Sequence, residues 1–495
     1  MSIDNATTAA PATERELFIN NEFVPNSTGE YVEVVDPATE KVFGRAAVAS
    51  VADVDKAVAA ARAAFDHGPW PRMTMQERAE ILNRWTDELD KDVEAVTRLL
   101  VQETGIPVGQ SQGGANTMQG ITRYYTSLAA DFPLVEERKG FTATASIEKV
   151  PVGVVAAIIP WNSPLGLAAF KLPQAMLAGC TVVMKPSEDT PLSAGYLGDA
   201  AVRAGIPEGV LNIVPALPEA SAHLVSHPGV DKVSFTGSTA VGRSIAAGAA
   251  PTLKQLTLEL GGKSAAVVLD DAPLDRLVYT MVPGVTNNNG AMCTVPSRLI
   301  VPAARHDEIV GALAEAFGTL KVGDPNAADT QVGPMITQRH YERVLEFLKS
   351  AEQEGGSFAV GGGKAPGLDE GYYVSPTIIT GVKSSARVAQ EEIFGPVLTV
   401  LTYETEEEAI ALANDTEYGL NGAVFSADVD HALSVARRLD AGTVSINNGI
   451  TIDITVPFGG FKQSGYGREL GPEGLDGYFH TKSVFLDGEP LITLS

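Results

Sequence analysis

The sequence predicts an α/β fold built around a parallel β-sheet that is covered by helices on both faces. The strand candidates, which are short and wholly apolar, are residues 154–159, 181–184, 211–214, 232–235 and 264–269. Helical stretches separate them, and continuous Val/Ile runs in this alternation are typical of strands buried on both faces. A second series of strands and helices follows residue 293, and 495 residues are enough for two or three domains.

Four segments before this series are assigned from their periodicity. Residues 17–19 and 31–35 are expected to form a hairpin around a polar turn. Residues 53–65 have helical spacing with an acidic start. Residues 76–103 have the pattern of one long amphipathic helix, which Gly105 ends.

Residues 141–148 alternate apolar and polar side chains, which predicts a strand with one solvent-exposed face. The strand-like segment 483–486, near the end of the chain, is its expected partner. An extended segment of this kind can also pair with another subunit.

The charge balance opposes several classes of partner. Lys and Arg number 36 against 61 Asp and Glu, a net charge of −25, which disfavours nucleic acid and anionic membranes. There is no run of about 18 uncharged apolar residues, so no transmembrane helix is expected. The first sixteen residues are polar without an apolar signal core, and two cysteines fit a reducing compartment. We therefore expect a cytoplasmic protein.

The histidines and cysteines are interpreted as scattered along the chain. The seven histidines and two cysteines are taken to offer no H-x-x-x-H or C-x-x-C spacing that would hold a metal. No zinc or iron site is therefore expected.

Cys293 follows an Asn/Gly-rich stretch, NNNGAM, which begins at Asn287. A loop of this composition lets backbone N–H groups point at the sulfur and at a bound oxygen. A free thiol has a pKa of about 8.5 and needs such help to react at neutral pH. A catalytic nucleophile and a buried structural cysteine are both open at this point, whereas Cys180, in an apolar run, is expected to be inert core.

Two further motifs have the features of a dinucleotide site. In the first, a strand runs into Gly237 and Ser238 and then a helix, so free N–H groups and a hydroxyl could hold a pyrophosphate. In the second, a buried strand delivers Lys185 and Glu188 at its carboxyl end, where an acidic group can hold ribose hydroxyls. A merely capped helix and a solvated ion pair are the open alternatives, and the chain has no G-x-G-x-x-G.

Two motifs have the features of catalytic chemistry. Glu259 stands in an apolar strand, where burial would raise its pKa toward a useful value for a general base. The glycines at 261 and 262 indicate a close approach to the backbone, although a water-facing edge carboxylate is the alternative. Asn162, fixed between two prolines, could offer an amide N–H to an oxyanion, or could simply belong to a turn.

Together these motifs resemble the NAD(P)-dependent aldehyde dehydrogenase superfamily. In chain order the matching motifs are Pro160-Trp161-Asn162, Lys185-Pro186-Ser187-Glu188, Phe235-Thr236-Gly237-Ser238-Thr239, Glu259-Leu260-Gly261-Gly262-Lys263, Cys293, Glu391-Glu392-Ile393-Phe394-Gly395-Pro396-Val397 and Pro457-Phe458-Gly459-Gly460-Phe461-Lys462. The resemblance spans about residues 17–486 and implies an aldehyde dehydrogenase-like fold, with a Rossmann-type cofactor domain, an α/β catalytic domain and a small β oligomerisation arm.

The resemblance also implies how the chain is divided. The NAD-binding domain would take residues 1–128 and 150–260, and the catalytic domain residues 261–465. The arm would take residues 129–149 and 479–495. By analogy, the protein would be a homodimer or a homotetramer.

The roles implied by the resemblance describe the oxidation of an aldehyde to its acid. Cys293 would attack the aldehyde to form a thiohemiacetal and then a thioester, with Asn162 and the Cys293 N–H as the oxyanion hole. Glu259 would activate the water that releases the acid. The implied cofactor-binding residues are Ile158, Trp161, Lys185, Glu188, Gly237, Ser238, Glu392 and Phe394. NAD is expected rather than NADP, because Glu188 would repel a 2′-phosphate.

The residues expected in the substrate tunnel, and the positions that differ from the family pattern, bear on which aldehyde and which cofactor the protein accepts. Ser163, Leu167, Phe170, Ile452 and Phe458 would line the tunnel, a largely apolar set that suggests an uncharged substrate tail. Ser163 stands where relatives have a large aromatic residue, Ala291 where they often have Gln, and Ala216 and Pro218 where glycines are common. These differences could widen the tunnel, alter the nucleophile loop and reshape the adenine pocket.

Other functions remain open from the sequence. A relative could pass its thioester to coenzyme A, although Glu259 favours attack by water. A catalytically silent structural homologue is disfavoured because Cys293, Glu259 and Asn162 are all retained. An unrelated thiol hydrolase would need a paired His, and no motif supplies one.

Overall fold

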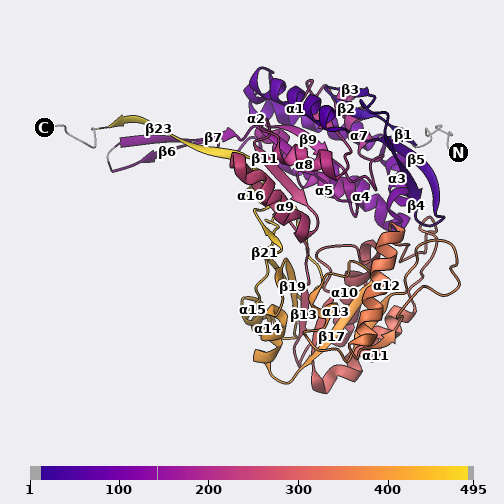
Figure 1. Cartoon of the computed structure of the whole chain (residues 1–495). Coiled ribbons are helices and arrows are strands. Elements are labelled where there is room, and N and C mark those ends of the chain that lie inside the picture. The colour runs from indigo at the N-terminus through magenta and orange to yellow at the C-terminus, as the bar shows by residue number, and fades with distance from the viewer. Residues whose placement is uncertain (1–12, 142, 489–495) are drawn as a thin grey trace, which may run out of the picture.

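The computed structural model describes residues 13–141 and 143–488. Its two large β-sheets lie in separate lobes, and a narrow three-stranded arm projects from one of them (Figure 1). Residues 1–12 and 489–495 of the expected cofactor domain and arm lie outside the described residues. The division into domains stays a prediction.

The first sheet has eight strands in the order β22-β12-β11-β8-β9-β10-β2-β3. Its five parallel strands are β8 (Val154–Ile158), β9 (Thr181–Lys185), β10 (Leu211–Ile213), β11 (Lys232–Thr236) and β12 (Gln255–Glu259). The chain builds β8, β9 and β10 outward on one side and then returns to place β11 and β12 on the other. This reversal creates a topological switch point between β8 and β11, where α/β sheets bind ligands.

The parallel strands are buried because helices cover both of their faces. Along β8, Val155 and Ala157 pack into one apolar core and Val154 and Ala156 into another. The helices of this lobe are α1 (Val51–Asp66), α2 (Met75–Asp90), α3 (Val93–Thr104), α4 (Val108–Leu128), α5 (Pro164–Ala169), α6 (Leu172–Ala178), α7 (Gly195–Ala204), α8 (Pro218–Ser226), α9 (Thr239–Ala249) and α16 (Gly471–Asp476). The predicted fold class is confirmed.

Two local predictions are wrong in this lobe. Residues 17–19 (β2) pair with Glu22–Val24 (β3), because Asn20 and Asn21 both adopt positive φ and close a two-residue turn. The segment expected as their partner, β4 (Tyr31–Asp36), pairs with β5 (Lys41–Ala47) in a small sheet with β1 (Glu14–Arg15).

The long helix expected over residues 76–103 is two helices. The first, α2, ends at Asp90, and α3 begins at Val93, so the chain breaks at residues 91–92. The amphipathic pattern continues across the break because both helices bury apolar residues in the same core, and periodicity alone therefore does not reveal it.

The second large sheet has seven strands in the order β15-β16-β17-β14-β13-β19-β20. Its strands are β13 (Ala265–Val268), β14 (Arg298–Pro302), β15 (Ser357–Val360), β16 (Thr377–Thr380), β17 (Val397–Tyr403), β19 (Asn421–Phe425) and β20 (Thr443–Ile446), of which only β15 is antiparallel. Its helices are α10 (Leu274–Thr286), α11 (His306–Gly318), α12 (Gln338–Gln353), α13 (Arg387–Gln390), α14 (Glu406–Asn414) and α15 (Val429–Ala436). Residues 264–269, expected in the first sheet, therefore belong to the second.

The two lobes are joined again by a late return of the chain. After β20, the short strand β21 (Phe461–Lys462) pairs with β18 (Tyr418–Gly419), and β22 (Gly465–Tyr466) adds to the edge of the first sheet beside β12. This return places residues 464–469 close to the carboxyl end of β12, next to Glu259.

The arm consists of β6 (Val135–Lys139), β7 (Ala143–Pro151) and β23 (Phe479–Gly488). The predicted pairing of 141–148 with 483–486 is confirmed for its described residues, with Ser483 opposite Ile147. Figure 1 shows the three strands extending away from the body of the molecule. Within residues 13–141 and 143–488, no helix combines the length and apolar character needed to cross a membrane.

Candidate active site

Cys293 lies at the end of a loop that connects α10 to β14. Within this loop Asn288 and Asn289 adopt left-handed backbone conformations, with φ of 54° and 56°. Gly290 has φ of 75°, and a Cβ there would meet the backbone of Gly395 at 2.2 Å. Asn tolerates the left-handed region better than other side chains, and only glycine fits the last position. The sequence NNNG therefore encodes the sharp turn that presents Cys293.

Side-chain amides hold this loop in place. Asn289 Nδ2 donates to the carbonyl of Gly105 at 3.1 Å and to that of Pro334 at 2.9 Å, and its Oδ1 accepts from Gly333 N–H. Asn288 Nδ2 donates to the carbonyl of Asn162 at 2.7 Å. The nucleophile loop is thereby fastened to both lobes.

The glycine pair that follows β12 explains the close approach expected there. A Cβ on Gly262 would lie 2.2 Å from the carbonyl oxygen of Cys293, and one on Gly261 would lie 2.8 Å from Glu392 Oε2. Gly262 N–H donates to Glu392 Oε1 at 3.0 Å. Burial raises the pKa of the Glu392 carboxyl to about 7.

A cavity of about 1130 Å³ opens at the switch point of the first sheet and extends to Cys293. Most of the residues predicted for the site line it, from both lobes. They are Ile158, Trp161, Asn162, Ser163, Leu167, Phe170, Lys185, Gly237, Ser238, Cys293, Glu392, Phe394, Ile452 and Phe458. The structure therefore brings together motifs that are nearly 300 residues apart in the chain.

One wall of the cavity is aromatic. The ring of Trp161 lies edge-on to that of Phe394 at 5.3 Å and close to that of His340 at 4.9 Å. His340 Nε2 donates to the carbonyl of Phe394 at 2.6 Å, and burial lowers the pKa of His340 to about 4, so its ring is neutral. Phe394 has a strained φ of 67°, which this contact helps to hold.

Asn162 faces the nucleophile loop from the end of β8. Its Nδ2 donates to the carbonyl of Ala291 at 2.8 Å. An amide nitrogen has two N–H donors, and Asn162 lines the cavity beside Cys293. The loop contact thus fixes the amide while its second donor remains for a ligand.

The chain is similar to known proteins over nearly its whole length. The family model described as the aldehyde dehydrogenase family matches residues 23–484. A geranial dehydrogenase of Castellaniella defragrans is 43% identical over 476 residues, which cover 96% of this chain and 99% of the relative. The chain belongs to the aldehyde dehydrogenase family. It is therefore an oxidoreductase that acts on aldehydes.

Other members of the family are similarly close. An aldehyde dehydrogenase [NAD(P)+] 1 of Saccharomyces cerevisiae is 40% identical and is covered over 95% of both chains. The crystal structure of a Mycobacterium tuberculosis aldehyde dehydrogenase complexed with NAD+ is 42% identical, with a TM-score of 0.94. It covers 97% of this chain and 100% of that one. The match includes both lobes and the arm.

In this aldehyde dehydrogenase the thiol of Cys293 is partly buried among acidic groups. Burial, and then the carboxyls of Glu392 and Glu259, raise the pKa of Cys293 well above its ordinary value. The raised pKa favours the protonated thiol, and the loop does not by itself supply the activation expected from the sequence. A base or a bound positive charge is needed to convert the Cys293 thiol into the reactive thiolate.

Glu259 does not line the cavity, although its neighbours Leu260 and Gly261 do. Its side chain is 2% exposed, and among the described residues neither carboxyl oxygen has a hydrogen-bond partner. Burial raises the pKa of Glu259 well above 4.5, and the nearby Glu469 raises it further. The predicted direction of this shift is confirmed.

Sequence reasoning missed a buried ion pair beside Glu259. Lys171 Nζ pairs with Glu469 Oε1 and also donates to Thr236 Oγ1 at 2.7 Å, and both charged side chains are at most 2% exposed. Lys171 is the only charged residue between 163 and 184. Such an isolated charge in an apolar run predicts a buried cation that needs an anion. Nothing comparable marks Glu469 in the sequence.

At the far end of the cavity, each of the two dinucleotide motifs makes the structural contact that was its alternative explanation, and each also contributes a residue to the cavity wall. Ser238 caps α9 by accepting from Val241 N–H, and it also lines the cavity with Gly237. Lys185 Nζ pairs with Glu188 Oε2 at 3.0 Å. Of this pair, Lys185 lines the cavity and Glu188 does not. Burial raises the pKa of Glu188, but the charges of Lys185 and Arg339 and the hydrogen bonds to the carboxylate together outweigh burial, and the net shift is downward.

The departures from the family pattern have local explanations. The carbonyl of Ala291, not its side chain, accepts the bonds from Asn162 and Asn288 that hold the loop. Ala216 is buried in the core below α8, and Pro218 begins that helix. Ser163 lines the cavity opposite Gly166, where a Cβ would lie 2.5 Å from the serine Oγ.

Proposed function

We propose that this protein oxidises an apolar aldehyde to its carboxylic acid with NAD⁺ through a covalent intermediate on Cys293. The observation that carries the proposal is the single cavity that joins the nucleophile loop to the switch point of the first sheet. A nucleophile, an amide donor, a helix start and apolar walls all face this one space.

The lining of the cavity fits a dinucleotide. Its volume of about 1130 Å³ exceeds the range of about 300–1,000 Å³ that is usual for one small ligand. The start of α9 at Ser238, with Gly237 before it, offers backbone N–H groups to a pyrophosphate. Lys185 and Glu188 would hold the adenosine ribose, and Glu392 and Phe394 the nicotinamide end, with Ile158 and Trp161 as apolar walls.

The acidic residue beside Lys185 supports NAD⁺ over NADP⁺. Glu188 would repel a 2′-phosphate, and its low pKa keeps it charged at neutral pH. NAD⁺ held by these residues would supply an acceptor for the hydride that leaves the carbon attached to Cys293. The relative complexed with NAD+ supports this choice.

The chain's own residues supply the remaining chemistry. After the thiol proton has left to solvent water, the Cys293 sulfur forms a bond to the aldehyde carbon as the C=O π bond opens. The oxygen that becomes negative accepts from Asn162 Nδ2 and from the Cys293 backbone N–H. Loss of hydride leaves a thioester on the sulfur. Water then attacks the thioester carbon, and the acid leaves as the C–S bond breaks.

Glu259 is proposed as the base that takes the proton from this water. No described residue hydrogen-bonds its oxygens, so the side chain is free to turn from the Lys171–Glu469 pair toward Cys293. Its raised pKa makes the ionised carboxylate a strong enough base to accept that proton from water. The same base disfavours transfer of the thioester to coenzyme A.

The substrate end of the cavity supports an apolar aldehyde. Leu167, Phe170, Ile452 and Phe458 line it, with the rings of Phe170 and Phe458 edge to face at 6.1 Å. Ser163 adds one small polar group. The similarity to a geranial dehydrogenase favours a branched or unsaturated aliphatic chain.

We also propose that the arm pairs with another copy of the chain and that the enzyme is cytoplasmic. The apolar side chains of Val135, Phe485 and Leu486 on the arm are 58–69% exposed, which is unusual unless a partner covers them. Both cysteines are free thiols, which agrees with a reducing compartment.

The central test is the Cys293→Ala variant assayed for NADH formation with a graded series of aliphatic and charged aldehydes. Wild-type enzyme should reduce NAD⁺ faster than NADP⁺ and should prefer uncharged, apolar aldehydes. The variant should bind NAD⁺ with unchanged affinity and produce no NADH. An active variant, or a preference for charged aldehydes, would refute the assignment.

A further inference from the structure

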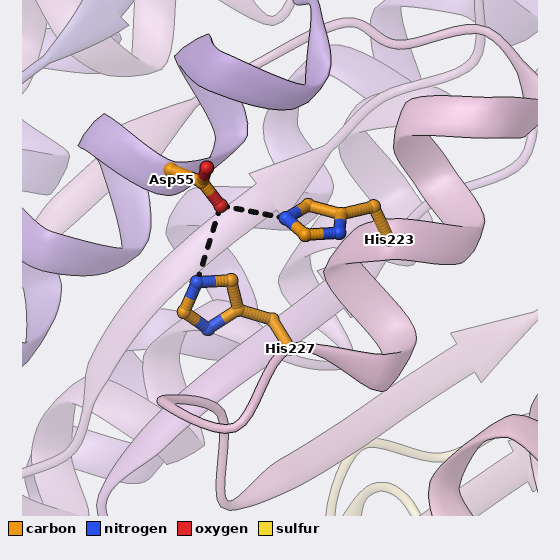
Figure 2. Close-up of side chains that lie close together, drawn as sticks. All are labelled: Asp55, His223 and His227. Carbon is orange, nitrogen blue, oxygen red and sulfur yellow. Dashed lines mark hydrogen bonds and ion pairs between the residues drawn. The ribbon is translucent and has the colours of Figure 1, made fainter.

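A cluster of three potential metal ligands lies outside the catalytic cavity, between α1 and α8. Asp55 comes from α1, His223 from α8, and His227 directly follows the last residue of α8 (Figure 2). None of the three lines the cavity. The interpretation of the histidines as scattered is wrong here, because His223 and His227 have the H-x-x-x-H spacing.

The three side chains converge on one point. Asp55 Oδ1 lies 2.6 Å from His223 Nε2 and 3.3 Å from His227 Nε2. The two rings are 5.4 Å apart and nearly perpendicular. Figure 2 shows both rings directing a nitrogen at the same carboxyl oxygen. Residues four apart on a helix share a face, and His227, as the residue that caps α8, still lies on the same side of the helix end as His223.

We propose that Asp55, His223 and His227 bind a divalent first-row transition ion of the Zn²⁺ type. Two imidazoles and one carboxylate are a donor set that suits such ions, and exposure on one side leaves positions for water. Zinc takes these ligands at about 2.0–2.2 Å, so tetrahedral donors stand about 3.4 Å apart. The distances of 2.6 and 3.3 Å need only a small widening to reach that separation.

The surroundings favour a cation on balance. The cluster lies at the carboxyl end of α8, where the helix dipole is negative. Lys254 opposes the ion, because its Nζ donates to the carbonyl of His227 at 2.7 Å. Gly229 N–H donates to His227 Nδ1 at 2.9 Å. Binding through Nε2 moves the ring proton to Nδ1 and breaks this bond, so the turn at Gly229 must adjust.

The proposed ion fastens two helices that cover the same face of the first sheet. Ala57, Val58 and Ala61 of α1 share an apolar core with Ala220 and Leu224 of α8. A metal bridge at the exposed edge of this packing closes it from the solvent side. We therefore expect the ion to raise thermal stability and to leave the chemistry at Cys293 unchanged.

The test is calorimetric titration of the Cys293→Ala protein with Zn²⁺ alone, because the catalytic thiol would otherwise bind zinc as well. One equivalent should bind, and it should raise the melting temperature. Adding His223→Ala or His227→Ala should weaken binding by at least about tenfold, since even the loss of an outer-shell partner costs about 10–100-fold. At the same zinc concentration these variants should bind less zinc and show a smaller rise in melting temperature.

His431→Ala in the same background is the matched control. His431 also pairs with a carboxylate, since its Nε2 lies 2.6 Å from Glu406 Oε2, but it lacks a second histidine. This variant should keep the zinc equivalent and the rise in melting temperature. Failure of Cys293→Ala protein to bind zinc would overturn the proposal. So would retained binding in both His223→Ala and His227→Ala, with circular dichroism confirming that the variants are folded.

Discussion

At the scale of single residues, the site contains several carboxyl groups whose pKa values are raised. The carboxyls of Glu259 and Glu469 are buried, that of Glu392 is half-buried, and the pKa of each is raised. Cys293 shares this environment, which raises the pKa of its thiol. The balance between these groups, rather than any one of them, sets when the sulfur and the water are activated.

Replacement of Glu259 by Gln is expected to separate the two halves of the reaction. The first turnover should still release NADH, whereas steady-state turnover should fall by about 10²–10⁴, the usual contribution of a general base. Stopped-flow absorbance at the NADH band measures both phases. Glu315→Gln, at an exposed position on α11, is the control and should match wild type.

Glu259 also determines whether steady-state turnover rises or falls with pH. Only the ionised carboxylate accepts a proton, so wild-type turnover should rise with pH through the raised pKa of Glu259. The Gln variant should lose this rise. Full steady-state activity in the variant, or an unchanged pH profile, would remove Glu259 from the mechanism.

At the scale of elements, the end of α3 supports the nucleophile loop. Gly105 ends this helix in the left-handed conformation, and its carbonyl accepts from Asn289 Nδ2. Two residues earlier, Glu103 is fully buried and accepts from the backbone N–H groups of Leu192 and Ser193. The helix end is therefore fastened to the first sheet's connections and to the catalytic loop together.

Glu103 should make stability fall as the pH rises. Burial raises the pKa of its carboxyl from 4.5 to about 7, so between these values the unfolded chain is ionised while the folded chain remains protonated. Raising the pH across this window favours unfolding by at most about 3 kcal/mol, at about 1.4 kcal/mol per pKa unit. Above about pH 7 the effect should level off.

Glu103→Gln tests this expectation, since the amide oxygen can keep the bond from Leu192 N–H. The melting temperature of wild type relative to the variant should fall between pH 4.5 and 7, as measured by circular dichroism. A difference in melting temperature that does not change with pH would show that Glu103 does not titrate in this window.

At the scale of the whole molecule, the arm is the part that the single chain leaves uncovered. Figure 1 shows β6, β7 and β23 standing clear of both lobes, and every side chain of β6 is exposed. Arm residues are also joined to the body, since β23 begins at Phe479, whose ring stacks on Phe132 at 5.8 Å. The base of the arm is rigidly held while its tip offers a sheet edge.

Phe485→Asp should weaken the association of subunits. Its side chain is 69% exposed on β23, and a charge there would be buried without a partner in an interface. Light scattering after size-exclusion chromatography should show a lower mass for the variant at equal concentration. Tyr279→Asp, which alters an exposed aromatic residue on α10, should leave the mass unchanged, and a monomeric wild type would contradict the proposal.

Much of the site could be read from the sequence because its parts are local. The turn NNNG, the glycine pair at 261–262 and the strand ends at Asn162 and Lys185 each encode their own backbone geometry. The apolar strands predict a doubly covered parallel sheet without reference to other segments. The order of these site motifs matches the series of motifs in the aldehyde dehydrogenase family, and this match predicts that the motifs meet at one cavity.

The sequence by itself therefore determined the fold class, the nucleophile loop and the reaction class of this aldehyde dehydrogenase. Only the tertiary structure decided which strand the segment 17–19 joins, that Glu259 faces Lys171 and Glu469, and that Asp55 meets His223 and His227. The physical reason is the separation in sequence between the interacting residues. Backbone turns and apolar periodicity depend on neighbours in sequence, whereas partners that lie 168 or 298 residues apart are chosen by packing, burial and charge in the folded chain.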